Sequence, residues 1–301
     1  MKLVMFRHDG DRRLGALRQG HDDEIADLSE LGYDLLGLID AGERGLERAR
    51  DVASSTGRIL PLKGTTLLPP LDPPRGNVLA IGRNYQKHAE ETARGGPVSP
   101  PTIFTKAITS ITGPFADIAI DPSISDQIDW EVELGVVIAK SGANIRRTDA
   151  FDHVFGYTAL NDVTARDIQS NWGGQYFKGK SLDRSCPVGP WVVTKDEIPD
   201  PQNLNLRLRV NGVVKQDGNT RNMIYPLDAL IEWLTKGMTL LPGAVIATGT
   251  PDGVGFARTP PEFLRAGDVM ETEVEGVGTL RNRVVPAKVS VLADHSQRSA
   301  W

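Results

Sequence analysis

The stretch Ile128-Asp129-Trp130-Glu131-Val132-Glu133-Leu134-Gly135-Val136-Val137-Ile138 decides the fold that this sequence predicts. Every even position in it is apolar, whereas the first three odd positions carry Asp129, Glu131 and Glu133. Such alternation is typical of a β-strand that buries one face and turns the other to solvent. Side chains two residues apart share a face of a strand, so the Cα atoms of Glu131 and Glu133 should lie roughly 6.6 Å apart.

Two carboxylates this close together repel each other. The repulsion is relieved when one of them takes up a proton or when a cation lies between them. Hard divalent ions such as Mg²⁺ and Mn²⁺ prefer oxygen ligands and often keep water molecules that a substrate can displace. Glu131 and Glu133 are therefore candidate metal ligands, and the alternative is a polar strand surface that faces water.

The composition of the 301 residues bounds the class of protein. With 40% hydrophobic and 24% charged residues and a net charge of −5, the chain lacks the basic blocks of proteins that bind nucleic acids or membrane surfaces. The 31 glycines and 20 prolines indicate many turns and a β-rich body. The single cysteine, Cys186, is expected to fill the core, and we expect a cytoplasmic protein without a signal peptide or membrane span.

The predicted fold is α+β and mainly β. Within the N-terminal part we expect a hairpin of Lys2–Arg7 and Leu14–Leu17 and a helix over Gly42–Ser54. Proline-rich chain cannot join the interior of a sheet, so it marks a linker. The predicted segments are a small N-terminal domain (1–68), this linker (69–76), a larger domain (77–286) and a C-terminal tail (287–301).

His88 and Glu91 follow a short apolar strand predicted over Asn77–Ile81 and stand three residues apart. On a helical turn this spacing places both side chains on one face. A carboxylate behind an imidazole is the usual arrangement of a general base. The glycine- and proline-rich Arg94–Pro101 that follows suits a mobile lid over a site. The alternative is a surface helix with an incidental pair of polar side chains.

A third acid, Asp162, follows an apolar strand predicted over His153–Leu160. If a helix begins near Asp162, then Asp162, Arg166 and Gln169 line one stripe of that helix. Asp162 would then complete a set of three carboxylates with the two glutamates. The alternative is that Asp162 only caps the helix.

Residues 174–181 match the G-x-x-x-x-G-K-[ST] pattern of phosphate-binding loops. We reject this interpretation because the residues before the pattern are polar and because Pro187 and Pro190 prevent the helix that must follow it. Lys180 remains of interest as a cation on a loop.

A second glycine-rich turn, Thr248–Gly255, follows a buried strand predicted over Ala244–Ala247. Its backbone amides could approach an anion closely, and a plain strand-to-loop turn is the alternative. The remaining predicted elements are strands Leu204–Val210 and Val213–Gln216 joined at Asn211-Gly212, an amphipathic helix Pro226–Lys236, and a hairpin of Val269–Val274 and Val277–Val284.

Taken together, these motifs resemble in order and spacing the fumarylacetoacetate hydrolase family over about residues 77–285. The resemblance is carried by Gly82-Arg83-Asn84-Tyr85 with His88, Asp129-Trp130-Glu131-Val132-Glu133-Leu134, Gly156-Tyr157 with Asn161-Asp162, Ala165-Arg166-Asp167-Ile168-Gln169, Gly179-Lys180-Ser181, Pro187 to Trp191, and Thr248-Gly249-Thr250-Pro251-Asp252-Gly253-Val254-Gly255.

The resemblance implies a mixed β-sandwich or roll with a divalent-metal site, in a homodimer. It implies that Glu131, Glu133 and Asp162 hold Mg²⁺ or Mn²⁺. By the same resemblance, the catalytic residues are His88, Glu91 and Lys180, and the substrate, a small keto acid, is held by Arg166, Gln169 and Thr250.

Several reactions share this scaffold. We predict a hydrolase that cleaves a carbon–carbon bond in acylpyruvates or related β-diketo acids, such as fumarylpyruvate or acetylpyruvate. One alternative is a decarboxylase of the oxaloacetate type or a keto–enol isomerase resembling 2-hydroxyhepta-2,4-diene-1,7-dioate isomerase. Another alternative is a non-catalytic protein that binds a metal or a ligand.

Overall fold

The computed structural model describes residues 1–92 and 100–287. In these residues strands dominate: a twelve-stranded sheet, a five-stranded sheet and a two-stranded pair stand beside four α-helices. This arrangement confirms the predicted α+β, mainly β fold. Within the same residues, no helix is both long and apolar enough to cross a membrane.

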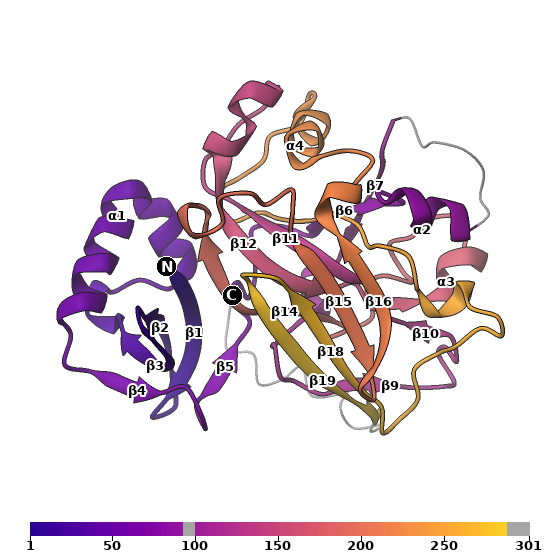
Figure 1. Cartoon of the computed structure of the whole chain (residues 1–301), viewed down its shortest axis with the longest axis horizontal. Helices are drawn as coiled ribbons and strands as arrows, with labels where there is room; N and C mark the ends of the chain where they lie inside the picture. Colours follow the sequence, from indigo (N-terminus) through magenta and orange to yellow (C-terminus); the bar gives the residue numbers. More distant parts are fainter. Residues whose placement is uncertain (93–99, 288–301) are drawn as a thin grey trace.

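The twelve-stranded sheet extends from the N-terminal strands at the left of Figure 1 to β6 and β7 at the right. Its order is β4-β3-β2-β1-β14-β12-β11-β17-β6-β7, with β5 beside β1 and β8 beside β14. The strands are β1 (Lys2–His8), β2 (Asp11–Arg18), β3 (His21–Asp27), β4 (Ile59–Pro61), β5 (Thr66–Leu68), β6 (Val78–Gly82), β7 (Thr102–Lys106), β8 (Ile111–Thr112), β11 (Val132–Ile138), β12 (Val154–Asn161), β14 (Cys186–Thr194) and β17 (Val245–Ala247).

The five-stranded sheet packs against β11 and β12 (Figure 1). Its order is β16-β15-β18-β19-β9, and its strands are β9 (Ile118–Ile120), β15 (Asn205–Val210), β16 (Val213–Asn219), β18 (Val269–Val274) and β19 (Gly278–Pro286). Asn211 and Gly212 have φ angles of 53° and 78°, which fits the predicted two-residue turn. Apolar side chains of both sheets, among them Val132, Val136, Leu206, Leu208 and Met270, form the largest core of the molecule.

The decisive stretch 128–138 forms two strands instead of one. β10 (Ile128–Asp129) pairs with β13 (Thr164–Ala165), whereas β11 pairs with β12 and β17. The alternative of a polar strand surface that faces water is wrong, because every residue from Ile128 to Ile138 is buried. Val137, at an odd position of β11, belongs to a second core. The glutamates are therefore removed from water, which makes an unpaired charge on them costly.

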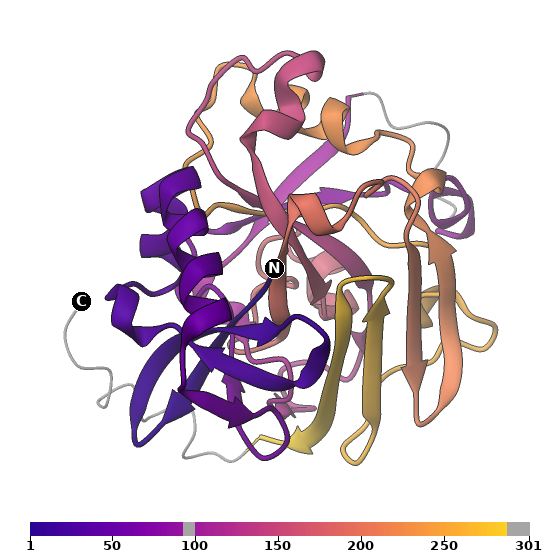
Figure 2. The ribbon, with the colours of Figure 1, turned by 60° about the vertical axis from the view of Figure 1, so that its left-hand side comes forward.

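The N-terminal residues form the predicted hairpin, β1 with β2, and α1 (Leu35–Ser55) lies over their strands (Figure 2). The helix begins earlier than predicted because Asp34 caps it, accepting a hydrogen bond from the backbone N–H of Gly37, and because it continues across a kink at Gly42. Strand β1 also pairs with β14, so the large sheet continues through the N-terminal residues into the rest of the molecule.

Three further helices are α2 (Gln86–Glu91), α3 (Arg166–Asn171) and α4 (Leu227–Thr235), and α4 confirms the helix predicted there. The helix expected near Asp162 begins only at Arg166, since the short strand β13 intervenes. Ala165 occupies the N-cap position of α3, so Asp162 does not cap it either. The chain passes from Ser181 to β14 without a helix, which confirms the rejection of a phosphate-binding loop.

Two predicted features fall largely outside the described residues. They are the lid over Arg94–Pro101, of which only the last two residues are described, and the tail over 287–301.

Candidate metal centre and active site

The pairing of β11 with β12 brings three acids together. The two strands run antiparallel with Val132 opposite Asn161, and the backbone N–H of Asp162 donates to the carbonyl of Glu131 over 2.9 Å. Asp162 therefore lies across from Glu131, and Glu133 follows two residues later on the same face of β11. One carboxylate oxygen from each of the three acids lies within 4.8 Å of the others. Strand register, rather than the predicted helix, positions Asp162.

Three buried cations surround two of these acids. Lys180 Nζ lies 2.6 Å from Glu131 Oε2 and 2.8 Å from Asp162 Oδ2. Arg166 contacts the other oxygen of Glu131 at 2.6 Å. Lys106, which the sequence analysis missed, contacts the other oxygen of Asp162 at 2.6 Å. Both oxygens of Glu131 and of Asp162 are thus neutralised from within the protein.

Glu133 is placed differently. Among the described residues, no side-chain cation lies within ion-pair distance of Glu133, and its Oε2 accepts a hydrogen bond of 2.7 Å from the backbone N–H of Gly249. Burial raises the pKa of Glu133 well above its ordinary value, and the negative charges of Asp162 and Glu131 raise it further. Without an added cation, these surroundings therefore favour the protonated form of the carboxyl group.

For Glu131 and Lys180, nearby opposite charges outweigh the effect of burial on the pKa. Burial by itself would raise the pKa of Glu131, but Lys180 and Arg166 outweigh burial and lower the pKa to about 2. Burial would likewise lower the pKa of Lys180, but Asp162 and Glu131 outweigh it and raise this pKa. Lys180 is therefore a permanent hydrogen-bond donor at the site and not a proton acceptor.

The donor set fits a hard divalent ion. Three carboxylates converge, all donor atoms are oxygens, and Glu133 has no internal cation to balance it once it ionises. Glu131, Glu133 and Asp162 are therefore the residues that would hold Mg²⁺ or Mn²⁺.

Binding of Mn²⁺ should strengthen as pH rises, because Glu133 must lose its proton to become a ligand. We expect the binding of each ion to release up to about one proton, measured by calorimetry in two buffers of different ionisation enthalpy. In the metal-free protein the folded state binds this proton more tightly than the unfolded chain does. The free energy of unfolding of the metal-free protein should therefore fall as pH rises above the ordinary pKa of glutamate. Binding that is independent of pH would contradict the assignment.

His88 and Glu91 lie on one turn of α2, as their spacing predicted. His88 Nδ1 is 2.8 Å from Glu91 Oε1, and His88 is almost completely buried. The other oxygen of Glu91 accepts a hydrogen bond of 2.9 Å from the backbone N–H of Gly253. Because Glu91 engages Nδ1, Nε2 is the ring nitrogen that can exchange a proton with a molecule in the pocket.

The backbone amides of the glycine-rich loop after β17 donate hydrogen bonds to carboxyl groups of the protein's own side chains. The N–H of Gly249 donates to Glu133, that of Gly253 donates to Glu91, and those of residues 255 and 256 donate to Asp129. Gly253 has a φ of 101°, and a Cβ atom there would lie 2.2 Å from a backbone oxygen of Lys215. Only glycine fits this position.

Arg166 and Gln169 lie on the first turn of α3. Arg166 Nε donates to Asp129 Oδ2 over 2.8 Å, and its Nη1 donates to Gln169 Oε1 over 3.1 Å. The guanidinium group lies 4.3 Å from the centroid of the Phe256 ring. Burial would lower the pKa of Arg166, but Glu131 and Asp129 outweigh it and raise the pKa, so the charge is permanent.

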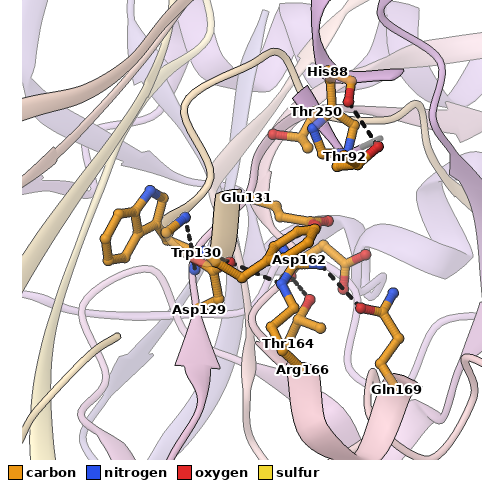
Figure 3. Close-up of polar contacts among 12 residues, drawn as sticks. His88, Thr92, Asp129, Trp130, Glu131, Asp162, Thr164, Arg166, Gln169 and Thr250 are labelled. Carbon is orange, nitrogen blue, oxygen red and sulfur yellow. Dashed lines mark hydrogen bonds and ion pairs between the residues drawn. The ribbon is translucent and has the colours of Figure 1, made fainter. Parts of the chain in front are cut away.

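One pocket, whose empty volume, its open mouth included, is about 470 Å³, is lined by seven of the predicted site residues: His88, Glu131, Glu133, Arg166, Gln169, Lys180 and Thr250. Figure 3 shows Glu131 between His88 and Thr250 on one side and Arg166 and Gln169 on the other. The Thr250 hydroxyl accepts a hydrogen bond of 2.8 Å from Gln216, which holds it in place. The pocket also contains residues that the sequence analysis did not assign to it, namely Ile81, Gly82, Arg83, Thr92, Phe104, Tyr176 and Phe256. Of these, Gly82 and Arg83 belong to a motif that carries the family resemblance, and Tyr176 lies within the rejected phosphate-loop pattern.

Comparison with named proteins gives close relatives. The chain is 46% identical over 249 residues to oxaloacetate tautomerase fahd2, mitochondrial, of Xenopus laevis, covering 82% of this chain and 77% of that protein. It is 41% identical over 292 residues to the human oxaloacetate tautomerase FAHD2A, mitochondrial, covering 95% and 92%.

Solved structures agree with these relatives. A fumarylacetoacetate hydrolase from Exiguobacterium antarcticum has a TM-score of 0.84 and 38% identity, over 95% of this chain and all of that one. A maleylpyruvate hydrolase from Sphingobium sp. SYK-6, in complex with manganese(II) and pyruvate, has a TM-score of 0.79 and 30% identity, over 96% and 100%. The family model described as fumarylacetoacetate (FAA) hydrolase C-terminal matches residues 77–285. The chain therefore belongs to the fumarylacetoacetate hydrolase family of enzymes.

Proposed function

We propose that this enzyme is a divalent-metal-dependent tautomerase that interconverts the keto and enol forms of a short 2-oxo dicarboxylate of the oxaloacetate type. The observation that carries the proposal is that a His–Glu pair, a permanently charged lysine and three converging carboxylates meet at one pocket. Relatives at 41% and 46% identity are named oxaloacetate tautomerases. A keto–enol isomerase was one part of the alternative in the sequence analysis, and these relatives favour that alternative over the acylpyruvate hydrolase.

His88 is the residue that would transfer a proton to and from a carbon atom of the substrate. In the keto form, His88 Nε2 would take a proton from the carbon next to the carbonyl. The electron pair of that C–H bond would form the carbon–carbon double bond, and the π pair of the carbonyl group would move to its oxygen. Glu91 holds the ring in place and stabilises the charged imidazolium that results. Return of the proton to oxygen gives the enol, and return to carbon restores the keto form.

A hydrogen-bond donor must stabilise the negative charge that develops on the substrate oxygen. Lys180 uses two of its three N–H bonds for Glu131 and Asp162, which leaves the third for the substrate. A fixed donor of this kind is worth about 3 kcal/mol in a transition state. Arg166 provides a permanent positive charge for a carboxylate of the substrate and is held by Asp129 and Phe256.

A divalent ion held by Glu131, Glu133 and Asp162 would supply Lewis acidity, which polarises the carbonyl group of a keto acid. The aromatic rings of Phe104, Tyr176 and Phe256 line the same pocket and would keep water away from a bound substrate. Exclusion of water favours proton shuttling over attack by water on the substrate.

Hydrolysis of an acylpyruvate is the second candidate, because the His88–Glu91 pair can also activate water. A maleylpyruvate hydrolase with bound manganese and pyruvate is among the similar structures. In that reaction His88 would take a proton from water, which attacks the distal carbonyl carbon. Cleavage of the carbon–carbon bond would then release a carboxylic acid and the enol form of pyruvate.

One experiment separates these reactions. The enzyme, loaded with Mg²⁺ or Mn²⁺, is given oxaloacetate, maleylpyruvate and acetylpyruvate in deuterated water, and the products are identified by mass and ultraviolet absorbance. We expect rapid equilibration of the enol and keto forms of oxaloacetate, without carbon dioxide or a carboxylic acid as product. Faster release of maleate or acetate would favour the hydrolase, and faster release of carbon dioxide would favour the decarboxylase.

A further inference from the structure

Lys106 is a buried cation that the proposed reaction does not use. It ends strand β7, and its side chain is 0% exposed. The described residues that line the pocket do not include Lys106, so the ammonium group does not touch a substrate there. A charged group buried in this way is stable only where its partners compensate the loss of its hydration.

Three oxygen atoms surround the Lys106 ammonium group and compensate the loss of its hydration. The ammonium group donates to the carbonyl oxygen of Lys180 and lies 3.4 Å from the carbonyl oxygen of Val163. Its third contact, at 2.6 Å, is with Oδ1 of Asp162. The ammonium group thus has two backbone carbonyl groups and one carboxylate around it, and its contact with the carboxylate is an ion pair.

Asp162 differs from the two glutamates in how it is held. Its Oδ2 is bound by Lys180, which also faces the pocket and is available to a substrate. Its Oδ1 is bound by Lys106, which does not line the pocket and is not available to a substrate there. When a substrate draws Lys180 toward itself, Lys106 remains as the contact that fixes the orientation of the carboxylate. Partners behind a metal ligand often set how well that ligand binds.

We propose that Lys106 is a positioning residue for the metal centre: it anchors Asp162 from behind, so that this carboxylate is presented to a divalent ion in one orientation. The inference rests on the metal centre of the proposed function. It concerns ion binding and not the chemical reaction, so it can be tested without a substrate.

The test is a titration of the full-length chain with Mn²⁺, in which free ion is measured by electron paramagnetic resonance. We expect Lys106→Met, which keeps the length of the side chain and removes its charge, to weaken Mn²⁺ binding 10- to 100-fold. The matched control is Lys215→Met, since Lys215 is also largely buried and paired with a glutamate, Glu262, outside the centre. Its Mn²⁺ affinity should stay within about twofold of that of the unaltered protein.

A second comparison keeps the test decisive if Lys106→Met folds poorly. Asp162→Asn removes the ligand, and the double variant K106M/D162N removes both charges of the pair. If Lys106 acts through Asp162, the double variant should bind Mn²⁺ as weakly as Asp162→Asn alone, within about twofold. A further loss in the double variant overturns the proposal, as does unchanged or tighter binding by Lys106→Met. If the unaltered protein binds no Mn²⁺, the metal centre fails, and the proposed function fails with it. If it binds the ion but does not tautomerise oxaloacetate, only the proposed function fails.

Discussion

Glu133→Gln should abolish metal-dependent turnover while leaving the metal-free fold intact. In the metal-free protein the surroundings favour the protonated form of Glu133, and a neutral amide of the same shape imitates that form. The amide oxygen can still accept the hydrogen bond from Gly249. However, glutamine cannot ionise, and the centre loses the one acid that has no internal cation. We expect turnover to fall about 1,000-fold, the equivalent of about 4 kcal/mol of Lewis-acid stabilisation.

Thermal unfolding with and without Mn²⁺ checks this result. At a concentration of Mn²⁺ 100 times its dissociation constant, the unaltered protein should gain about 2.7 kcal/mol, and Glu133→Gln should gain almost none. With a chelator present, the two proteins should melt at the same temperature. Glu47→Gln, at an exposed position on α1, is the matched control and should behave as the unaltered protein does. A variant that stays active would show that Glu133 is not a ligand.

His88→Asn is the second change with a large expected effect. The asparagine amide can still donate to Glu91 in place of Nδ1–H, but it has no counterpart of Nε2. If His88 moves the proton, turnover should fall about 100- to 10,000-fold. The Mn²⁺ affinity should change little, because the carboxylates of the centre come from β11 and from the end of β12.

Steady-state kinetics with oxaloacetate, together with Mn²⁺ titration, measures both properties. His153→Asn is the control, since His153 also uses Nδ1 for a hydrogen bond, to the carbonyl of Lys140, but lies away from the pocket. A loss of less than about tenfold in His88→Asn would contradict the proposed role. A loss of Mn²⁺ affinity instead of turnover would mean that His88 supports the centre and not the proton transfer.

Local spacing accounts for the parts of the site that the sequence predicts well. Glu131 and Glu133 share a strand face because they are two residues apart, and His88 meets Glu91 because they lie on one helical turn. The buried Cys186, whose pKa burial raises to about 12, is likewise the core filler that its sequence surroundings suggested. Each of these inferences needs only a few neighbouring residues.

Long-range pairing accounts for what the sequence did not reveal. Asp162 reaches the glutamates through the register of β11 and β12, whereas the sequence analysis relied on a helix that begins four residues later. Lys106 comes from β7, and no spacing pattern links that strand to Asp162. The decisive stretch was expected to expose one face because its acids alternate with apolar residues. Alternation cannot distinguish a face covered by water from one covered by cations and further chain.

The loop after β17 has a consequence for how this enzyme could diversify. Its main-chain amides hold Glu133, Glu91 and Asp129, and at Gly253 the backbone leaves no room for a side chain. The side chains of Thr250 and Phe256, which face the pocket from the same loop, take no part in these hydrogen bonds. Selection or design can therefore exchange Thr250 to admit a different keto acid while the amides keep Glu133 and Glu91 in place. An exchange of Phe256 would also remove the ring beside Arg166.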